Sequence, residues 1–100
     1  MNLDVVLTRA AKADIAEATT WYRERSATAA ERFLAEIAST MRRLAMQPTA
    51  QPTVDTVTHT RRVLVRRFPY RVFYVIEDSR AVVLAVIHFR RDDSAWRERS

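Results

Sequence analysis

Apolar residues recur every three or four positions in two stretches of the N-terminal half of the chain, which is the spacing of one face of an amphipathic helix. The first stretch covers about residues 9–25, and its apolar positions are Ala11, Ile15, Ala18 and Tyr22. The second ends near Met46, and its apolar positions are Ala30, Phe33, Leu34, Ile37, Met41 and Leu44. Only residues 26–27 separate the two stretches, so the pattern predicts an antiparallel helix hairpin.

Capping residues mark the ends of both predicted helices. Thr8 precedes the first helix and is a suitable N-cap. Thr28 and Glu31 stand three residues apart ahead of the second apolar stripe, which is the spacing of a capping box. Pro48 follows the second helix and indicates its end, because proline cannot continue a helix.

Apolar runs bounded by turn residues predict four strands. One precedes the helices and three follow a polar, proline-containing loop at 47–60; they cover residues 3–7, 61–67, 70–77 and 80–89. Short connections make the last three an antiparallel meander. The order strand, helix, helix and three strands predicts a single α+β domain over residues 1–100, in which the helix hairpin packs on one face of a mostly antiparallel sheet.

The last two strands are apolar on both faces, whereas a sheet with one face in water alternates apolar and polar residues. Strict alternation places Tyr70, Val72, Tyr74 and Ile76 opposite to Arg71, Phe73 and Val75, and Val82, Leu84, Val86 and His88 opposite to Ala81, Val83, Ala85, Ile87 and Phe89. One hairpin covers one face, which leaves the other for Trp96 with the long loop or for a partner. One tryptophan and a polar loop are too small to cover the apolar surface of two strands, so the pattern favours a partner that covers at least part of this face.

Positive charge is concentrated in the C-terminal half. The chain has a formal net charge of +5, from 17 basic and 12 acidic residues. Residues 55–100 hold ten of the basic and six of the acidic side chains, a net charge of +4. All but one of the basic residues are arginine, which suits bidentate contacts to carboxylate or phosphate. This distribution predicts an acidic partner, either protein or nucleic acid.

Composition excludes several classes of protein. Cysteine is absent, so the chain has no disulfide or thiolate site, and a reducing cytoplasm is the expected location. Without glycine it has no Walker or Rossmann phosphate loop. Its two histidines lack metal-binding spacing, so we expect neither a metal nor a cofactor. There is no apolar run long enough to span a bilayer and no signal-peptide pattern, so we expect no membrane association.

A cluster of arginines and aromatic residues remains as candidate chemistry. It comprises Arg61, Arg62, Arg66, Arg67, Arg71, His88, Arg90 and Arg91, with Phe68, Tyr70 and Phe89 among them. Metal-free RNA cleavage needs a base for the 2′-hydroxyl, an acid for the leaving oxygen and cations on the phosphate. His88 and Arg71 fill two of these roles if they face the same side of the sheet, which alternation alone does not decide.

Several segments together resemble toxins of the RelE/ParE superfamily from bacterial type II toxin–antitoxin modules. They are AKADIAEATTWY and AAERFLAEI in the predicted helices, the run RRFPYRVFYVIEDSRAVVLAVIH, and the RRD shortly after it. The resemblance implies a helix hairpin on an antiparallel sheet and a role in plasmid stabilisation. It also implies a cognate ParD- or RelB-like antitoxin that wraps and neutralises the toxin.

The superfamily has two modes of action. RelE-like members cleave mRNA on the ribosome, whereas ParE-like members poison DNA gyrase and do not cleave RNA. Arg71 matches the strand arginine that holds phosphate in the ribonucleases, and His88 falls near a catalytic position. Those enzymes then have a tyrosine, where this chain has Phe89, which offers no acid or base. The resemblance therefore favours gyrase inhibition by a toxin that is not an enzyme, with metal-free, ribosome-dependent mRNA cleavage as the alternative.

Two sets of contact residues follow from this resemblance. We predict that target binding uses Arg66, Arg67, Arg71, His88, Arg90 and Arg91. We predict that the antitoxin contacts Trp21, Tyr22, Tyr74, Phe89 and Trp96, and that Trp96 also pins the tail against the sheet. A non-toxic basic module that binds nucleic acid only electrostatically is a third interpretation, and a steep loss of binding with salt would distinguish it.

Overall fold

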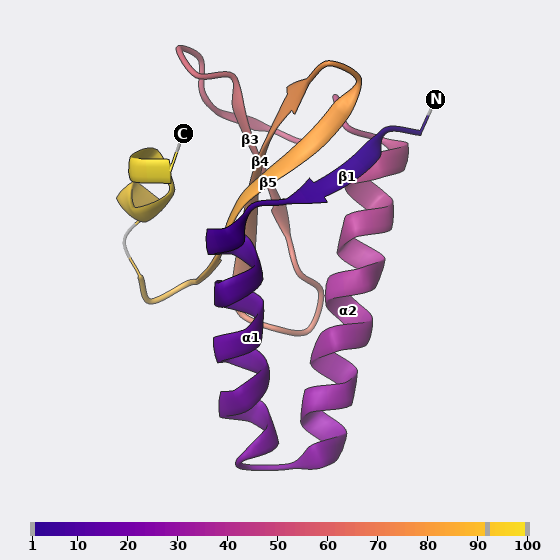
Figure 1. The fold of residues 1–100 in the computed structure, drawn as a ribbon, viewed down its shortest axis with the longest axis vertical. Helices are drawn as coiled ribbons and strands as arrows, with labels where there is room; N and C mark the ends of the chain where they lie inside the picture. The colour runs from indigo at the N-terminus through magenta and orange to yellow at the C-terminus, as the bar shows by residue number, and fades with distance from the viewer. Residues whose placement is uncertain (1, 92, 100) are drawn as a thin grey trace.

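The computed structural model describes residues 2–91 and 93–99, with the backbone alone for 93–95. In chain order its elements are β1 (Asp4–Leu7), α1 (Arg9–Arg23), α2 (Ala27–Met46), β2 (Thr53–Asp55), β3 (Thr60–Leu64), β4 (Tyr70–Glu77), β5 (Arg80–His88) and the 3-10 helix η1 (Asp93–Arg99). The strands form one sheet in the order β1–β5–β4–β3–β2, with β1 parallel to β5 and the other neighbours antiparallel (Figure 1). The predicted α+β fold is confirmed.

Side-chain caps begin both helices. The hydroxyl oxygen of Thr8 accepts a hydrogen bond from the Ala11 amide at 3.1 Å, so the predicted cap of α1 is confirmed. The predicted capping box at Thr28 is wrong, because α2 begins one residue before it. Ser26 has an extended backbone and caps α2 by accepting a hydrogen bond from the Ala29 amide at 3.2 Å. Each cap pairs an amide that has no partner within its helix.

The loop predicted at 47–60 contains a short strand that the sequence analysis missed. This strand, β2, pairs irregularly with β3 at the edge of the sheet. The carboxylate of its last residue, Asp55, accepts hydrogen bonds from the amides of Val57 at 2.8 Å and Thr58 at 3.1 Å. These bonds favour the charged carboxylate and hold the pKa of Asp55 below its usual value. A strand of three residues shows too little alternation to be found from sequence.

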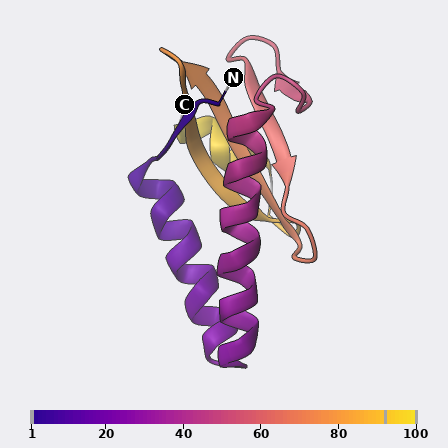
Figure 2. The same ribbon diagram turned by 90° about the vertical axis from the view of Figure 1, so that its right-hand side faces the viewer.

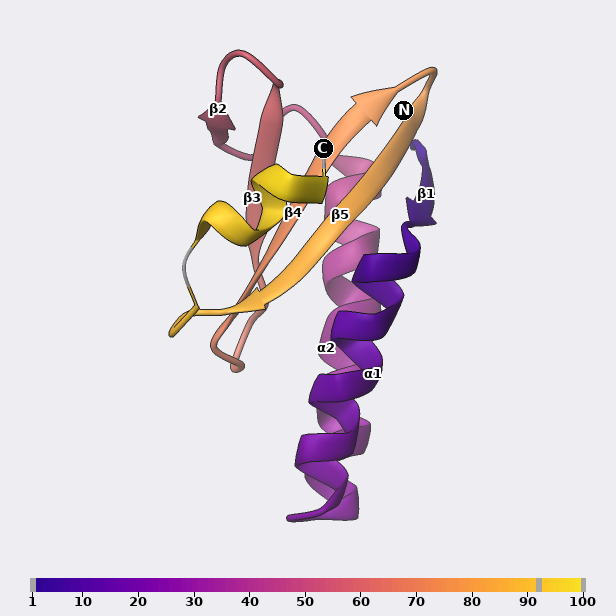
Figure 3. The same ribbon diagram turned by 60° about the vertical axis from the view of Figure 1, so that its left-hand side comes forward.

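The two helices lie together on one side of the sheet (Figure 2). The other side is covered by the C-terminal segment of the chain itself: Figure 3 shows η1 across the sheet from the helices. Trp96 is only 1% exposed and stacks on Phe73 of β4, with ring centroids 5.5 Å apart. Ala85 and Ile87 complete this second core, and Val54 of β2 packs against it. The predicted role of Trp96 as a pin is confirmed, and the tail buries this second core without a partner. Leu64, which pairs with Arg71, stays 48% exposed, so the expectation that a partner covers part of this face stays a prediction.

Ionic contacts hold the tail near both edges of the sheet. The guanidinium of Arg99 pairs with the carboxylate of Asp14 in α1 at 2.5 Å, and Asp14 also accepts the amide N–H of Val86 at 2.9 Å. Arg97 lies 3.9 Å from Asp55 in β2. The Asp14 pair is the stronger of the two, because Asp14 is almost fully buried and Arg97 is mostly exposed. Val86 lies where β5 extends past its neighbour β1, so the carboxylate takes the place of a strand carbonyl there.

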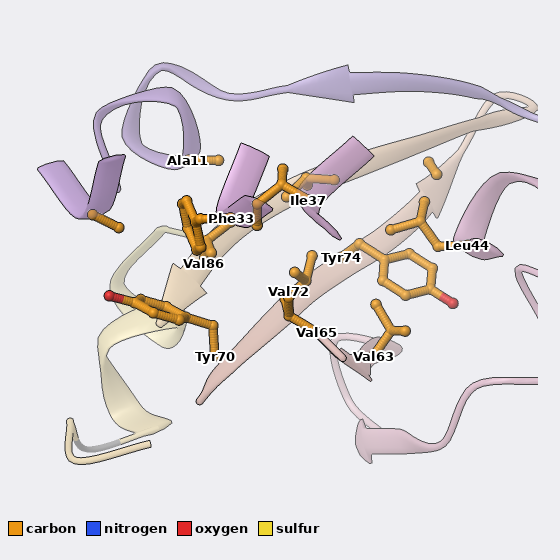
Figure 4. Close-up of a cluster of buried hydrophobic side chains, with 13 residues drawn as sticks. Ala11, Phe33, Ile37, Leu44, Val63, Val65, Tyr70, Val72, Tyr74 and Val86 are labelled. Atoms are coloured by element: carbon orange, nitrogen blue, oxygen red, sulfur yellow. The ribbon is translucent and has the colours of Figure 1, made fainter. Parts of the chain in front are cut away.

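A bulge in β5 changes which residues share a face. The register between β4 and β5 shifts between Phe73 and Tyr74, which leaves Leu84 without a partner in β4. As a result, Val83 and Val86 both lie in the core beneath the helices, together with the side chains drawn in Figure 4. Strict alternation had placed these two valines on opposite faces, and that prediction is wrong because alternation does not survive a bulge.

The β4–β5 turn has a strained backbone that a substitution can relieve. Asp78 and Ser79 have φ of 48° and 63°, in the left-handed region that favours glycine. Replacing Ser79 with glycine is expected to raise the free energy of unfolding by about 0.5–1 kcal/mol, since the strain outweighs the added flexibility of the unfolded chain. Urea denaturation measures this, with Ser79→Ala as a control that keeps the strain. Equal stability of the two variants would contradict it.

Candidate functional site

Four exposed arginines lie at one end of the sheet. The register pairs Tyr70, the first residue of β4, with His88, the last residue of β5. The turn before β4 and the turn after β5 therefore lie at the same end, which we call the basic end. The arginines on these two turns are Arg66, Arg67, Arg90 and Arg91. Residues from the predicted target-binding set, distant in sequence, are thus brought to one place.

Arg71, also in that set, is partly exposed, and its guanidinium binds backbone carbonyls. Its Nη2 donates to the carbonyl oxygen of Arg91 at 3.0 Å, and to those of His88 and Phe89 at 3.4 Å each. The guanidinium carbon lies 5.4 Å from the centre of the Phe89 ring. These contacts hold the backbone of the turn that carries Arg90 and Arg91. Arg71 therefore contributes to the basic end by fixing the conformation of this turn.

Arg71 and His88 lie on opposite faces of the sheet. Tyr70 and Val72 both belong to the core under the helices, so Arg71, between them, points to the other face. His88 is on the helix side, where its ring meets Tyr70 edge to face at a centroid distance of 5.1 Å. The condition for a ribonuclease pair, that both side chains face one side, is not met.

A groove of about 480 Å³ lies on the helix side of the basic end, between α1 and the end of β5. We call it the α1–β5 groove. It is lined by Asp14, Glu17, Ala18, Trp21 and Tyr22 of α1, by Pro69 and Tyr70, and by Val86, His88, Arg90 and Arg91. The α1 residues Asp14, Glu17 and Trp21 follow one helical stripe beside the core stripe, to which Ala18 belongs. Sequence reasoning missed Asp14 and Glu17, although their spacing from Trp21 was a usable signal.

A pair of hydrogen-bonded phenols lies within this groove. The hydroxyls of Tyr22 and Tyr70 are hydrogen-bonded to each other. Burial raises the pKa of Tyr70 to about 12, and Tyr22 and the charge of Glu17 add to the effect. Tyr70 is therefore a neutral hydrogen-bonding group at pH 7 and not a base.

The groove also has an exposed aromatic wall and a polar end. Trp21 is 49% exposed, and the guanidinium of Arg25 lies 3.6 Å from the centre of its ring. At the other end, Nδ1 of His88 accepts the amide N–H of Arg90 at 3.1 Å. Since Nδ1 is the acceptor, the neutral ring carries its proton on Nε2 and is a donor there.

Two of the five residues predicted to contact an antitoxin lie in the interior. Tyr74 is fully buried, and its hydroxyl donates to the carbonyl of Pro48 at 2.6 Å. Burial raises the pKa of Tyr74 to about 12, as expected for an internal phenol. Trp96 is buried against the sheet. Neither side chain is at a surface that a partner contacts in this conformation, and their assignment is corrected to core residues. The accessible members of the set are Trp21, Tyr22 and Phe89.

A comparison with protein families finds one match that spans most of the chain. The model of the family described as "ParE toxin of type II toxin-antitoxin system, parDE" matches residues 5–93. No curated protein matches significantly. Within the described residues, no helix is both long and apolar enough to cross a membrane, and no three acidic or histidine side chains gather as metal ligands.

Proposed function

This chain belongs to the ParE toxin family of type II toxin–antitoxin systems, and from that premise we propose that it acts by inhibiting DNA gyrase and is neutralised by a cognate antitoxin. The alternative within the superfamily is cleavage of mRNA on the ribosome. A choice between them rests on whether the molecule holds a set of groups able to move protons at a phosphate.

The separation of Arg71 from His88 is the observation that carries the proposal. A ribonuclease without metal needs its cation and its proton-transfer group at the same phosphate. Here the two side chains lie on opposite faces, and Arg71 is held by three backbone carbonyls. The face towards which Arg71 points is also filled by Trp96. This arrangement favours a toxin that acts by binding.

The basic end is the surface that we assign to the target. Arg66, Arg90 and Arg91 are exposed there, and Arg67 is only loosely paired with Glu36 at 3.4 Å. Exposed cations attract an acidic partner and orient it before contact. We assign the antitoxin to the accessible aromatic residues Trp21, Tyr22 and Phe89, with a segment that also covers the basic end.

A gyrase assay tests this function. Purified toxin added to gyrase and supercoiled DNA in the presence of ATP is expected to trap the enzyme on broken DNA, so that linear DNA accumulates after detergent and protease treatment. Addition of the antitoxin at equimolar concentration is expected to prevent this. Normal gyrase activity with excess toxin would contradict the proposal. Cleavage of mRNA by the same preparation on ribosomes would establish the alternative.

A further inference from the structure

The α1–β5 groove is lined by cations from the turn after β5 and by a carboxylate from α1, a division of charge that its role as a protein contact does not require. Arg90 and Arg91 line the groove from the turn after β5, and Glu17 lines it from α1. Asp14, although it also lines the groove, is neutralised by its pair with Arg99. A ligand that fits this arrangement is negative at one end only and offers hydrogen-bond donors at the other.

Aromatic side chains also line the groove. Trp21 presents a half-exposed indole, and the Arg25 guanidinium covers one face of it at 3.6 Å from the ring centre, so a ligand stacks on the face that Arg25 leaves open. Tyr22 meets Trp21 edge to face at 5.0 Å, which holds the indole in position. A flat, conjugated ligand gains most from such a wall, because it stacks over its whole area.

We propose that the α1–β5 groove binds one nucleotide unit of a single-stranded nucleic acid. The phosphate lies against Arg90 and Arg91, with Nε2–H of His88 as a further donor. The base stacks on Trp21, and its exocyclic amino group donates to the carboxylate of Glu17. An acidic peptide fits less well, because it carries negative charge along its length and so past Glu17. This inference goes beyond gyrase inhibition and does not depend on it.

Binding of labelled 12-nucleotide strands to the purified full-length toxin, followed by fluorescence anisotropy, tests the proposal without gyrase or antitoxin. Oligo-dC and oligo-dT are a matched pair, since cytosine has an exocyclic amino group and thymine does not. We expect tighter binding of oligo-dC and loss of this preference in Glu17→Gln. Binding of dCMP, measured by calorimetry, reports whether a free nucleotide suffices; either source of the nucleotide supports the proposal.

Substitutions separate stacking from general attraction. Trp21→Ala is expected to weaken oligo-dC binding about 5- to 150-fold, and Trp21→Phe to restore part of it. Arg90→Ala with Arg91→Ala is expected to lower the slope of log affinity against log salt by about 0.7, for the loss of one neutralised phosphate. Arg32→Ala with Arg42→Ala removes the same charge from exposed positions on α2 and is the control.

Three results would overturn the proposal. The first is that neither oligo-dC nor dCMP binds at low salt. The second is equal affinity of the Trp21→Ala variant and the unaltered protein, which means that binding is electrostatic and outside the groove. The third is loss of acidic-peptide binding in Trp21→Ala with strand binding unchanged, which makes the groove a peptide site. Thermal melts of each variant establish that the fold is intact.

Discussion

Replacing Trp96 with alanine is expected to lower the free energy of unfolding by about 3–5 kcal/mol, the usual cost of removing a large aromatic side chain from a core. Trp96 is almost fully buried and stacks on Phe73, and the second core has few other large side chains. Its loss uncovers Ala85 and Ile87 to water. Because small domains are stable by only about 5–15 kcal/mol, the variant is expected to be marginally folded and to aggregate.

Urea unfolding followed by circular dichroism measures this effect. Trp21→Ala is the matched control, since it removes the same side chain from a half-exposed position and is expected to cost about 1 kcal/mol or less. If Trp96→Ala unfolds at the same urea concentration as the unaltered protein, the tail does not hold the second face of the sheet. The role assigned to Trp96 is then wrong.

Replacing both Arg90 and Arg91 with alanine is expected to abolish toxicity. Both side chains are exposed at the basic end, on a turn whose shape comes from Arg71 and not from them. Stability is therefore expected to change by about 0.5 kcal/mol or less. Antitoxin binding is expected to weaken by less than about tenfold, because charges at the rim contribute little to the affinity of a large apolar interface.

Plating efficiency after induced expression measures this toxicity. The double variant Arg32→Ala, Arg42→Ala carries the same change of charge on α2 and is expected to remain fully toxic. Protein levels are compared by immunoblot in every strain. Full toxicity of a stably expressed Arg90 and Arg91 variant would remove the basic end from the target contact.

Local patterns in the sequence predicted most of the fold. Helical spacing placed α1 and α2 to within two residues at each end, and the unusual two-sided apolar strands identified a second core. The sequence analysis favoured a partner over Trp96 as the group that buries this core. A single indole buries about 150–250 Å², which is enough to cover a small apolar face with few neighbours. The cap of α2 was misplaced by two residues, since both Ser26 and Thr28 suit an N-cap and sequence does not show which backbone is extended.

The site depended on contacts that no local pattern contains. The bulge at Leu84 reverses the side of the sheet to which the residues before it in β5 point, relative to strict alternation, and the residue types there do not predict a bulge. The pair of Asp14 with Arg99 joins residues 85 positions apart. The side of the sheet on which His88 lies, on which the proposal of gyrase inhibition rests, follows from its pairing with Tyr70 and so from the register of β4 and β5. Register is set by the whole core and not by the residues of the site.

Mapping RNA 5′ ends and DNA breaks in the same cells after induction tests gyrase inhibition most directly. We predict broken DNA at gyrase sites with transcripts left intact, both for the unaltered toxin and for His88→Gln, which keeps a hydrogen-bond donor and costs roughly 1 kcal/mol as a packing change. A ribonuclease that lost its proton-transfer group would instead slow by about 10²- to 10⁴-fold. Discrete new 5′ ends within translated codons, lost in the His88→Gln strain, together with unbroken DNA, would contradict gyrase inhibition and identify an mRNA-cleaving toxin.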